Sequence, residues 1–323
     1  MSEAASGASA FTATVEERHE ATADIALLTL RPPFPVQAPP PGSHLDVAVR
    51  LPTGPETRSY SLVDLGHDDG LLRIAVRKEP DGRGGSAWMH RLRPGDEVEV
   101  TGPLDEFPLT PGPAPSLLLA AGVGITPVLG LARALKARGG DYRVLYTGRA
   151  RPDMAFTDAL EAAHGARATV VESTQRGRVR AHDVISTLSP DGVLYVCGPM
   201  ALLKDVRRVW EQDGRAPANL RFETFATSGA LPARHFRVDV PSRGVSVDVP
   251  VGTSMLDALQ EAGVELMYDC RRGECGLCRV RVLAAEGTVD HRDVFLSARQ
   301  KNAGRHMCAC VSRVAGTRVT IDC

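Results

Sequence analysis

Three cysteines lie close together at a spacing that could hold a metal cluster. Cys270, Cys275 and Cys278 form the pattern C-x4-C-x2-C, the spacing of a plant-type 2Fe–2S cluster when a fourth cysteine follows further along the chain. The three thiolates would converge from one loop, and Gly273 and Gly276 permit the tight turns that such a loop needs. The alternative is a zinc site, but zinc motifs usually contain two C-x2-C pairs and this segment contains one. The spacing therefore favours an iron–sulfur cluster.

Cys308 and Cys310 are the two candidates for the fourth thiolate. A cluster with four cysteine ligands needs only one of them, and the residues alone leave both open. The chain has seven cysteines in all. An odd number, in a chain that begins without an export signal, argues against a disulfide framework and for a reducing compartment, the cytoplasm.

Two segments in the first third of the chain could hold a flavin. In Arg58-Ser59-Tyr60-Ser61, an arginine can clamp a phosphate, an aromatic ring can stack on the isoalloxazine, and a hydroxyl can bond a flavin nitrogen. Residues 82–86 (GRGGS) then open a predicted short helix at 87–92, whose free N–H groups suit a phosphate. Taken singly, the first segment could be a half-exposed strand and the second an ordinary glycine turn.

Two further segments could hold a dinucleotide. In residues 121–127 (AGVGITP), Gly122 and Gly124 would let a pyrophosphate approach the backbone, and the proline suits the first turn of a helix. The full G-x-G-x-x-G pattern is absent. Cys197-Gly198-Pro199 ends a later predicted strand, at the carboxyl edge where α/β sheets bind ligands. Cys197 could equally be a buried structural thiol.

The elements that must position these residues change character twice along the chain. The first ~110 residues contain short strands with alternating apolar side chains, for example at 44–50, 71–77 and 97–101, and predict a small antiparallel β-barrel. After residues 110–115 (TPGPAP), strands alternate with amphipathic helices and predict a doubly wound parallel sheet. The predicted strands are 117–121, 142–147, 168–172, 193–197 and 221–224, and the predicted helices are 126–137, 154–163 and 201–211.

A second linker, at 227–233, precedes the part that carries the cysteines. Residues 235–240 and 245–249 predict a hairpin, and residues 254–262 predict a helix capped by Ser254 or Thr253.

Composition limits the class of protein. The 323 residues suggest two or three domains, and a net charge of −1 gives no argument for a nucleic-acid or membrane partner. The longest apolar stretch, 117–134, is interrupted by glycines and a proline and is unsuited to span a bilayer. Residues 1–10 are small and polar, and we expect a disordered tail there.

The order of these motifs resembles that of the phthalate dioxygenase reductase family, close to its vanillate demethylase reductase subunits. The resemblance runs from about Phe11 to Cys323 and includes EFPL at 106–109, FETF at 222–225, DHRD at 290–293 and CVSR at 310–313. It implies an FMN-binding β-barrel at 11–111, an NAD-binding α/β domain at 112–228 and a plant-type ferredoxin domain of the β-grasp fold at 229–323.

The same resemblance implies an activity. NADH would donate hydride to FMN, and electrons would pass singly through the 2Fe–2S cluster to a terminal oxygenase. The expected oxygenase is a Rieske non-haem iron protein, with a haem-thiolate monooxygenase as runner-up, and the reductase is expected to be a monomer. Two rival hypotheses are a non-enzymatic redox sensor and a flavin enzyme that reduces a small molecule directly.

Site residues carry over by position. The flavin contacts would be Arg58, Ser59, Tyr60, Ser61, Arg77 and Lys78, with Gly84, Gly85 and Ser86 at the phosphate. Gly122, Gly124, Gly198 and Pro199 would bind the nucleotide, Thr126 would lie beside flavin and nicotinamide, Cys197 would lie near the hydride-transfer site, and Phe225 would pack near the flavin.

The resemblance also bears on the fourth cluster ligand. The spacing in free plant ferredoxins favours Cys308, whereas the CVSR context and the distance to a predicted last strand at 317–321 favour Cys310. Cys310 is therefore the expected ligand, with Cys270, Cys275 and Cys278. The two extra residues would be absorbed by a loop between Cys278 and Asp290.

Two features concern specificity. NADH-using relatives tend to have acidic residues after the strand at 168–172, whereas this chain has Arg176 and Arg178, which could meet a 2′-phosphate or remain solvated. NADH remains the prediction.

The ferredoxin part, from Arg234 onward, has 13 Lys and Arg against 11 Asp and Glu, a net charge of +2, so docking through a broad acidic face is not expected. Arg271 and Arg272 could contact the partner or simply face solvent.

Overall fold

A computed structural model describes residues 10–36, 38–52, 54–80, 82, 84–225, 234–269 and 271–323. The chain forms two compact units, Met1–Glu223 and Thr224–Cys323. The predicted tail lies outside the described residues except for Ala10, which begins the first strand, and so does the whole predicted linker at 227–233.

The first sheet is the predicted antiparallel barrel. Its strands lie in the order β4-β3-β6-β1-β2-β5, and a bridge between Leu62 and Ile74 joins the two end strands. The Val63 N–H donates to the Arg73 carbonyl at 2.8 Å beside that bridge, so the sheet curls toward closure. The strands are β1 (Ala10–Glu20), β2 (Ile25–Arg31), β3 (His44–Leu51), β4 (Gly54–Ser61), β5 (Leu72–Arg77) and β6 (Glu97–Leu104).

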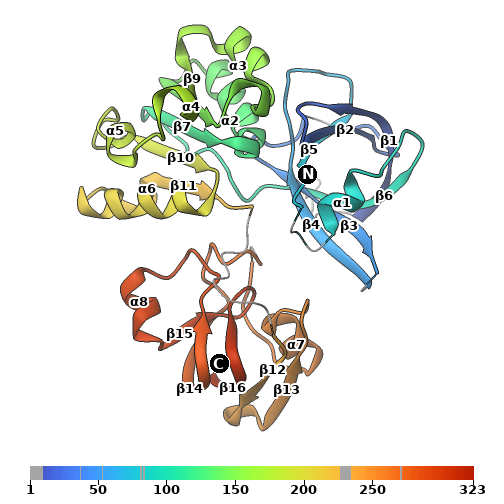
Figure 1. Cartoon of the computed structure of the whole chain (residues 1–323), viewed down its shortest axis with the longest axis vertical. Coiled ribbons are helices and arrows are strands. Elements are labelled where there is room, and N and C mark those ends of the chain that lie inside the picture. Colours follow the sequence, from blue (N-terminus) through green and yellow to red (C-terminus); the bar gives the residue numbers. More distant parts are fainter. Residues whose placement is uncertain are drawn as a thin grey trace, which may run out of the picture. The chain divides into compact units, whose positions relative to one another are not determined.

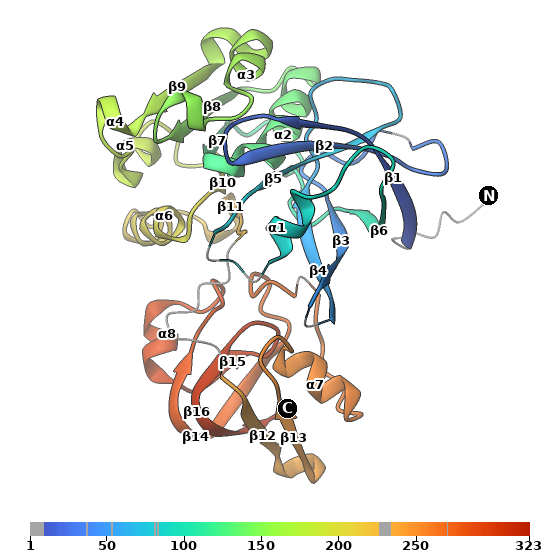
Figure 2. The same ribbon diagram turned by 45° about the vertical axis from the view of Figure 1, so that its right-hand side comes forward.

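A short helix, α1 (Gly85–Met89), packs against β3, and Figure 2 shows it alongside β3 and β4. It begins two residues before the predicted helix at 87–92. Gly84 precedes it with a positive φ of 95°, a conformation that glycine adopts at no steric cost.

The second sheet is parallel and has the order β11-β10-β7-β8-β9. Alternate residues of its central strand enter two different cores: Leu118 and Ala120 pack with α2 and α3, whereas Leu117 and Leu119 pack with α5 and α6. Helices therefore cover both faces (Figure 1), which confirms the predicted doubly wound fold. The elements are β7 (Ser116–Ala121), α2 (Ile125–Ala137), β8 (Tyr142–Gly148), α3 (Thr157–His164), β9 (Ala168–Glu172), α4 (Ser173–Arg176), α5 (Ala181–Ile185), β10 (Val193–Cys197), α6 (Met200–Gln212) and β11 (Leu220–Glu223).

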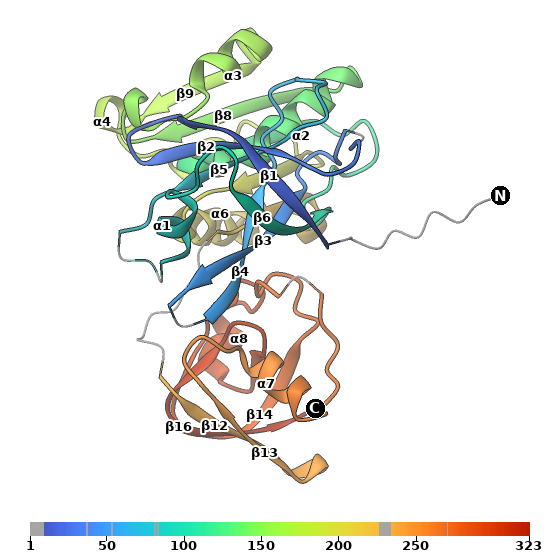
Figure 3. The ribbon, with the colours of Figure 1, turned by 90° about the vertical axis from the view of Figure 1, so that its right-hand side faces the viewer.

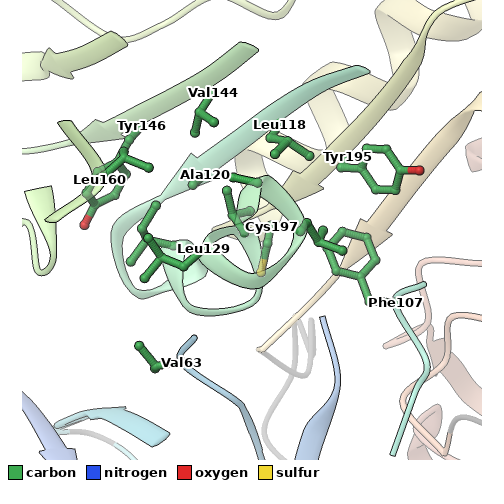
Figure 4. Packing of buried hydrophobic residues seen from close by; sticks show 14 of the residues in the cluster. Val63, Phe107, Leu118, Ala120, Leu129, Val144, Tyr146, Leu160, Tyr195 and Cys197 are labelled. Carbon is green, nitrogen blue, oxygen red and sulfur yellow. The ribbon is translucent and has the colours of Figure 1, made fainter. Parts of the chain in front are cut away.

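Barrel and parallel sheet share one hydrophobic cluster. Ile25, Val63 and Phe107 belong to the same buried group as the α2 face of the parallel sheet, part of which Figure 4 shows. This shared core explains why both sheets fall in one compact unit.

The third sheet, in the second unit, has the order β13-β12-β16-β14-β15 and is mixed, since β12 and β16 are parallel. Figure 3 shows α7 lying across it. The Ser254 hydroxyl caps α7 by accepting from the Asp257 N–H at 3.0 Å, as predicted. This is the predicted β-grasp unit. The elements are β12 (Phe236–Val240), β13 (Val245–Val249), α7 (Met255–Glu261), β14 (Arg279–Asp290), α8 (Ala298–Ala303), β15 (His306–Cys308) and β16 (Arg313–Asp322).

The expectation of a loop between Cys278 and Asp290 is wrong, because this stretch is the strand β14. Its pairing with β16 shifts register twice: one extra residue lies in β14 at Leu283, and another lies in β16 opposite Gly287. Such β-bulges absorb an added residue without breaking a sheet. The last strand is correspondingly longer than the predicted 317–321.

The predicted helix at 154–163 begins later, at Thr157. Met154 instead packs against Gly148, where an added Cβ would lie 2.3 Å from the methionine Cγ. The Thr157 hydroxyl donates to the Met154 carbonyl at 2.8 Å.

Candidate redox site

The flavin-binding candidates on β4 alternate between the two faces of that strand. Glu56, Arg58 and Tyr60 are half-buried on one face, and the residues between them are exposed. Arg58 forms an ion pair of 2.5 Å with Glu56. Burial raises the pKa of Tyr60 to about 12 against the opposing effect of Arg58, so its phenol is neutral at physiological pH and suited to stack on a flavin.

Ser59 is set apart from the other β4 candidates. Its side chain is on the exposed face, and its hydroxyl donates to Asp46 at 2.5 Å. The alternation of side chains along a strand makes this unavoidable, because Arg58 and Tyr60 both occupy the other face. The structure therefore does not bring the Ser59 side chain together with the residues predicted beside it.

The predicted phosphate-binding segment lies against Arg58. A Cβ on Gly85 would come within 2.9 Å of the Arg58 Nε, so only glycine leaves room for the guanidinium at the first turn of α1. The Ser86 hydroxyl accepts a hydrogen bond of 3.0 Å from the Glu79 N–H. Positive charge and free backbone N–H groups thus meet in one place, as a phosphate requires.

Arg77 and Lys78 lie at the end of β5, beside Asp24. The Arg77 Nε is 3.1 Å from an Asp24 carboxylate oxygen. The Lys78 N–H donates to the Asp24 carbonyl at 2.7 Å, and its side chain is exposed.

The nucleotide-binding candidates meet where the strand order of the parallel sheet reverses, between β7 and β10. A Cβ on Gly124 would lie 2.3 Å from the Cys197 carbonyl oxygen, and one on Gly198 would lie 2.8 Å from the Ala121 Cβ. The two glycines are therefore required for the loop after β7 to touch the end of β10. Ligands of open α/β sheets bind at this reversal point.

Cys197 and Thr126 are both buried at this edge. The Thr126 hydroxyl donates to the Val123 carbonyl at 3.0 Å, which closes the first turn of α2. Figure 4 shows Cys197 at the end of its strand, beside that turn. Pro199 is exposed at the start of α6.

Glu223 is a site residue that the motif analysis missed. It is 2% exposed, and its carboxylate accepts a hydrogen bond of 3.1 Å from the Ser61 hydroxyl. It also pairs in register with Cys197 across β10 and β11. Glu223 therefore joins the end of the barrel strand β4 to the edge of the parallel sheet. The only sequence signal was its place in the FETF stretch. Phe225, also in that stretch, is 43% exposed.

The cluster loop depends on its two glycines. Gly273 and Gly276 have φ values of 76° and 75°. A Cβ on Gly273 would lie 2.8 Å from the Asp293 Cα, and one on Gly276 would lie 2.4 Å from the Phe295 ring. The loop is thus pressed onto the segment that follows β14, as the sequence pattern required.

The sulfurs of Cys278 and Cys310 lie close together. Cys278 Sγ lies 3.1 Å from Cys310 Sγ. Hydrogen bonds from the thiols of Cys308 and Cys310, of which the Cys308 bond has the larger effect, lower the pKa of the Cys278 thiol to about 3. The thiolate is the form that binds iron. Cys275 is half-buried, and Cys270 lies outside the described residues. Within the described part of the chain, no group of three or more metal-binding side chains forms, so the four-cysteine set remains a prediction.

Hydrogen bonds fix the cluster loop at Arg271 and at Glu274. The Glu274 carboxylate accepts from the N–H and from the hydroxyl of Thr224, both at 2.8 Å. Burial raises the pKa of Glu274. The Arg271 guanidinium donates to Asp257 at 2.7 Å and lies 4.4 Å from the centre of the Tyr268 ring.

Neither arginine of the loop is simply solvated. Arg271 is held against α7 by the contacts just described, and the Arg272 side chain is 16% exposed beside Glu274. Their contact with a partner protein remains a prediction. By contrast, Arg176 and Arg178 are exposed at the end of α4.

No helix in the described part of the chain is long and apolar enough to cross a membrane.

Three family models match the chain in the predicted order. The oxidoreductase FAD-binding domain matches residues 12–108, and the oxidoreductase NAD-binding domain matches residues 118–208. The 2Fe-2S iron-sulfur cluster binding domain matches residues 238–315. Fold and site together therefore define an iron–sulfur flavoprotein oxidoreductase.

Individual relatives agree with the family models. The chain is 36% identical over 282 residues to the heme-dependent oxidative N-demethylase beta subunit of Ectopseudomonas mendocina, covering 87% of this chain and 88% of that protein. It is 30% identical over 316 residues to phthalate dioxygenase reductase of Burkholderia cepacia, and the alignment covers 95% of this chain and 96% of that protein. The solved structure of phthalate dioxygenase reductase has a TM-score of 0.76 and covers 97% of this chain and 98% of that one.

A fourth match lies in a longer protein. Full-length CYP116B46 from Tepidiphilus thermophilus has a TM-score of 0.72 at 33% identity and covers 97% of this chain but 42% of that one. The chain belongs to the phthalate dioxygenase reductase family of NAD(P)H-dependent oxidoreductases.

Proposed function

We propose that this chain is the NADH-dependent, FMN-containing reductase component of an oxygenase system, working in the cytoplasm. The observation that carries this proposal is the convergence of Ser61, Cys197 and Glu223. Ser61 belongs to the flavin barrel, and Cys197 and Glu223 belong to the nucleotide-binding sheet. The 3.1 Å hydrogen bond between Ser61 and Glu223 joins the barrel to the sheet within one compact unit. Hydride transfer requires this juxtaposition, because flavin and nicotinamide must stack face to face.

The residues divide the work as follows. Arg58 and the first turn of α1 hold the flavin phosphate, and Tyr60 packs on the ring. Gly124 and Gly198 would let the dinucleotide approach the backbone, and Thr126 and Cys197 would lie beside the nicotinamide. When bound, the flavin accepts hydride and releases electrons one at a time to the cluster held by Cys270, Cys275, Cys278 and Cys310.

The test is an anaerobic titration of the holoprotein with NADH. We expect the flavin absorbance to bleach and the EPR signal of a reduced 2Fe–2S cluster to appear. Cytochrome c and ferricyanide should then both be reduced rapidly. Reduction of neither acceptor would favour the redox-sensor hypothesis, and fast NADH oxidation driven by a small molecule without a partner protein would favour the direct flavin enzyme.

FMN is proposed as the flavin, although the matching family model is one for FAD binding. The proposal of FMN follows from the family resemblance. Acid extraction followed by chromatography should release FMN. Recovery of one FAD per chain would overturn the proposal of FMN and leave the proposed electron-transfer function intact.

The partner is proposed to be a terminal oxygenase, most simply a Rieske non-haem iron protein. A haem protein is the second candidate, because one relative is the beta subunit of a heme-dependent demethylase and another match is a cytochrome P450. Reconstitution distinguishes them: this reductase and NADH should support turnover of one class of oxygenase and reduce the other slowly.

A further inference from the structure

Two thiols, not one, are presented to Cys278 by the segment Cys308-Ala309-Cys310. The Ala309 N–H donates to the Cys278 carbonyl at 3.0 Å, and Cys308 ends β15 in register with Arg279, the residue after Cys278. This pairing holds the segment along the cluster loop. The Cys278 sulfur is hydrogen-bonded to the Cys310 sulfur at 3.1 Å and also to the thiol of Cys308.

The two thiols differ in depth. Cys308 is fully buried among the apolar side chains of the unit, and Cys310 is 7% exposed. The turn after β15 separates them, with the Ser312 N–H donating to the Cys308 carbonyl at 3.0 Å. Cys310 therefore lies nearer the surface than Cys308.

We propose that Cys308 is a reserve ligand of the iron–sulfur cluster, able to replace Cys310 on the iron that Cys278 helps to hold. The proposal rests on the ligand set proposed above. In the exchange, the bond between iron and the Cys310 sulfur breaks and a bond to the Cys308 sulfur forms. The proton of the Cys308 thiol passes to the Cys310 thiolate, so no electron is gained or lost and no further reactant is needed.

The exchange of one sulfur ligand for the other needs little movement of the chain. The Cys310 sulfur lies 3.1 Å from the Cys278 sulfur, and the Cys308 thiol is also hydrogen-bonded to the Cys278 sulfur. Replacing one by the other therefore needs a shift only within the segment Cys308-Ala309-Cys310 and leaves β15 and β16 each paired with β14. A buried cysteine that serves only as a small apolar side chain would explain the burial of Cys308. It would not explain why its thiol is directed at a cluster ligand.

Full-length protein, isolated and reconstituted with iron and sulfide without oxygen, tests this. Cys310→Ala should keep the wild-type ratio of iron to flavin but show shifted EPR and visible spectra. Cys308→Ala should show wild-type spectra, and the double variant Cys308→Ala/Cys310→Ala should hold no iron. Cys323→Ala, which removes an exposed thiol of the same unit, is the matched control.

Two outcomes would overturn the proposal. One is a Cys310→Ala protein that binds flavin and no iron while the wild type holds its cluster. The other is a double variant with the same shifted spectra as Cys310→Ala. Cys310→Ser, which preserves the size of the side chain, repeats the first comparison if the alanine variant does not fold. Absence of iron from the wild type would instead refute the proposed function.

Discussion

At the scale of single residues, the hydride-transfer site depends on groups that the fold buries. Cys197 is fully buried and Glu223 almost so, and both lie at the ends of adjacent parallel strands. A carboxylate in such a place is costly to bury for packing alone, although a thiol is not. The hydrogen bond of Glu223 to Ser61, at the strand position beside Cys197, argues that these groups orient the reacting rings.

Substitution of Cys197 by alanine is expected to slow flavin reduction by NADH by about tenfold to a hundredfold, the range produced by misplacing a reacting group. Flavin and iron content should stay at the wild-type level, since Cys197 belongs to neither set of ligands. Stopped-flow absorbance under anaerobic conditions measures the rate. An unchanged rate would mean that Cys197 is a structural thiol.

Glu223→Gln is expected to slow the same step while leaving the stability nearly unchanged. Glutamine matches the shape of the side chain and its carbonyl can still accept from Ser61, but the negative charge is lost. Glu223→Ala should in addition lower the free energy of unfolding by about 1–3 kcal/mol, because the Ser61 hydroxyl is left buried without this acceptor. Equal rates of flavin reduction in the wild type and in Glu223→Gln would show that the negative charge of Glu223 plays no part in this step.

At the scale of elements, the strand ends are brought together by glycines. The loop after β7 touches the end of β10 only because Gly124 has no side chain, and the cluster loop touches the segment after β14 only because Gly273 and Gly276 have none. These contacts join segments that are distant in sequence.

Gly124→Ala is therefore expected to destabilise the first unit by about 1–3 kcal/mol, a typical cost of overpacking, and to raise KM for NADH. Gly122→Ala is the comparison, because its Cβ would meet nothing within 4 Å although its φ is 57°. Urea unfolding and steady-state kinetics measure both effects. A Gly124→Ala protein with wild-type stability and wild-type KM would show that the contact with Cys197 is unimportant.

At the scale of the whole molecule, three functions are distributed over two compact units. The flavin barrel and the nucleotide sheet share a hydrophobic core, as hydride transfer requires. The cluster has its own unit, with a core of its own. The family models for flavin and NAD binding match the first unit, and the model for the 2Fe-2S cluster matches the second.

For the donor, kcat/KM should be higher with NADH than with NADPH. Replacing Arg176 and Arg178 together by alanine should change kcat/KM for NADH by less than about fivefold, because exposed charges contribute at most about 1 kcal/mol. Steady-state ferricyanide reduction with both nucleotides measures this. A preference for NADPH that the double substitution abolishes would reverse the assignment.

The local patterns determined much of this fold in advance. Alternating apolar residues predicted the strands β3 and β5 nearly to the residue, because a half-buried strand must alternate, and a short apolar run predicted the fully buried strand β10. Helices on both faces of the second sheet followed from strands that alternate with amphipathic helices. The cysteine spacing and its two glycines predicted the cluster loop, because only a tight turn brings thiolates together so close in sequence.

Only the tertiary structure decided what depends on contacts between distant segments. The partnership of Ser61 with Glu223 spans 162 positions, and no local pattern encodes it. Alternation placed Ser59 on the face of β4 opposite Arg58 and Tyr60, and pairing with β16 turned an expected loop into the bulged strand β14. The two sulfurs beside Cys278 likewise became neighbours through the pairing of β14 with β15. Register and burial are properties of the packed chain, because each is set by the segment that packs opposite.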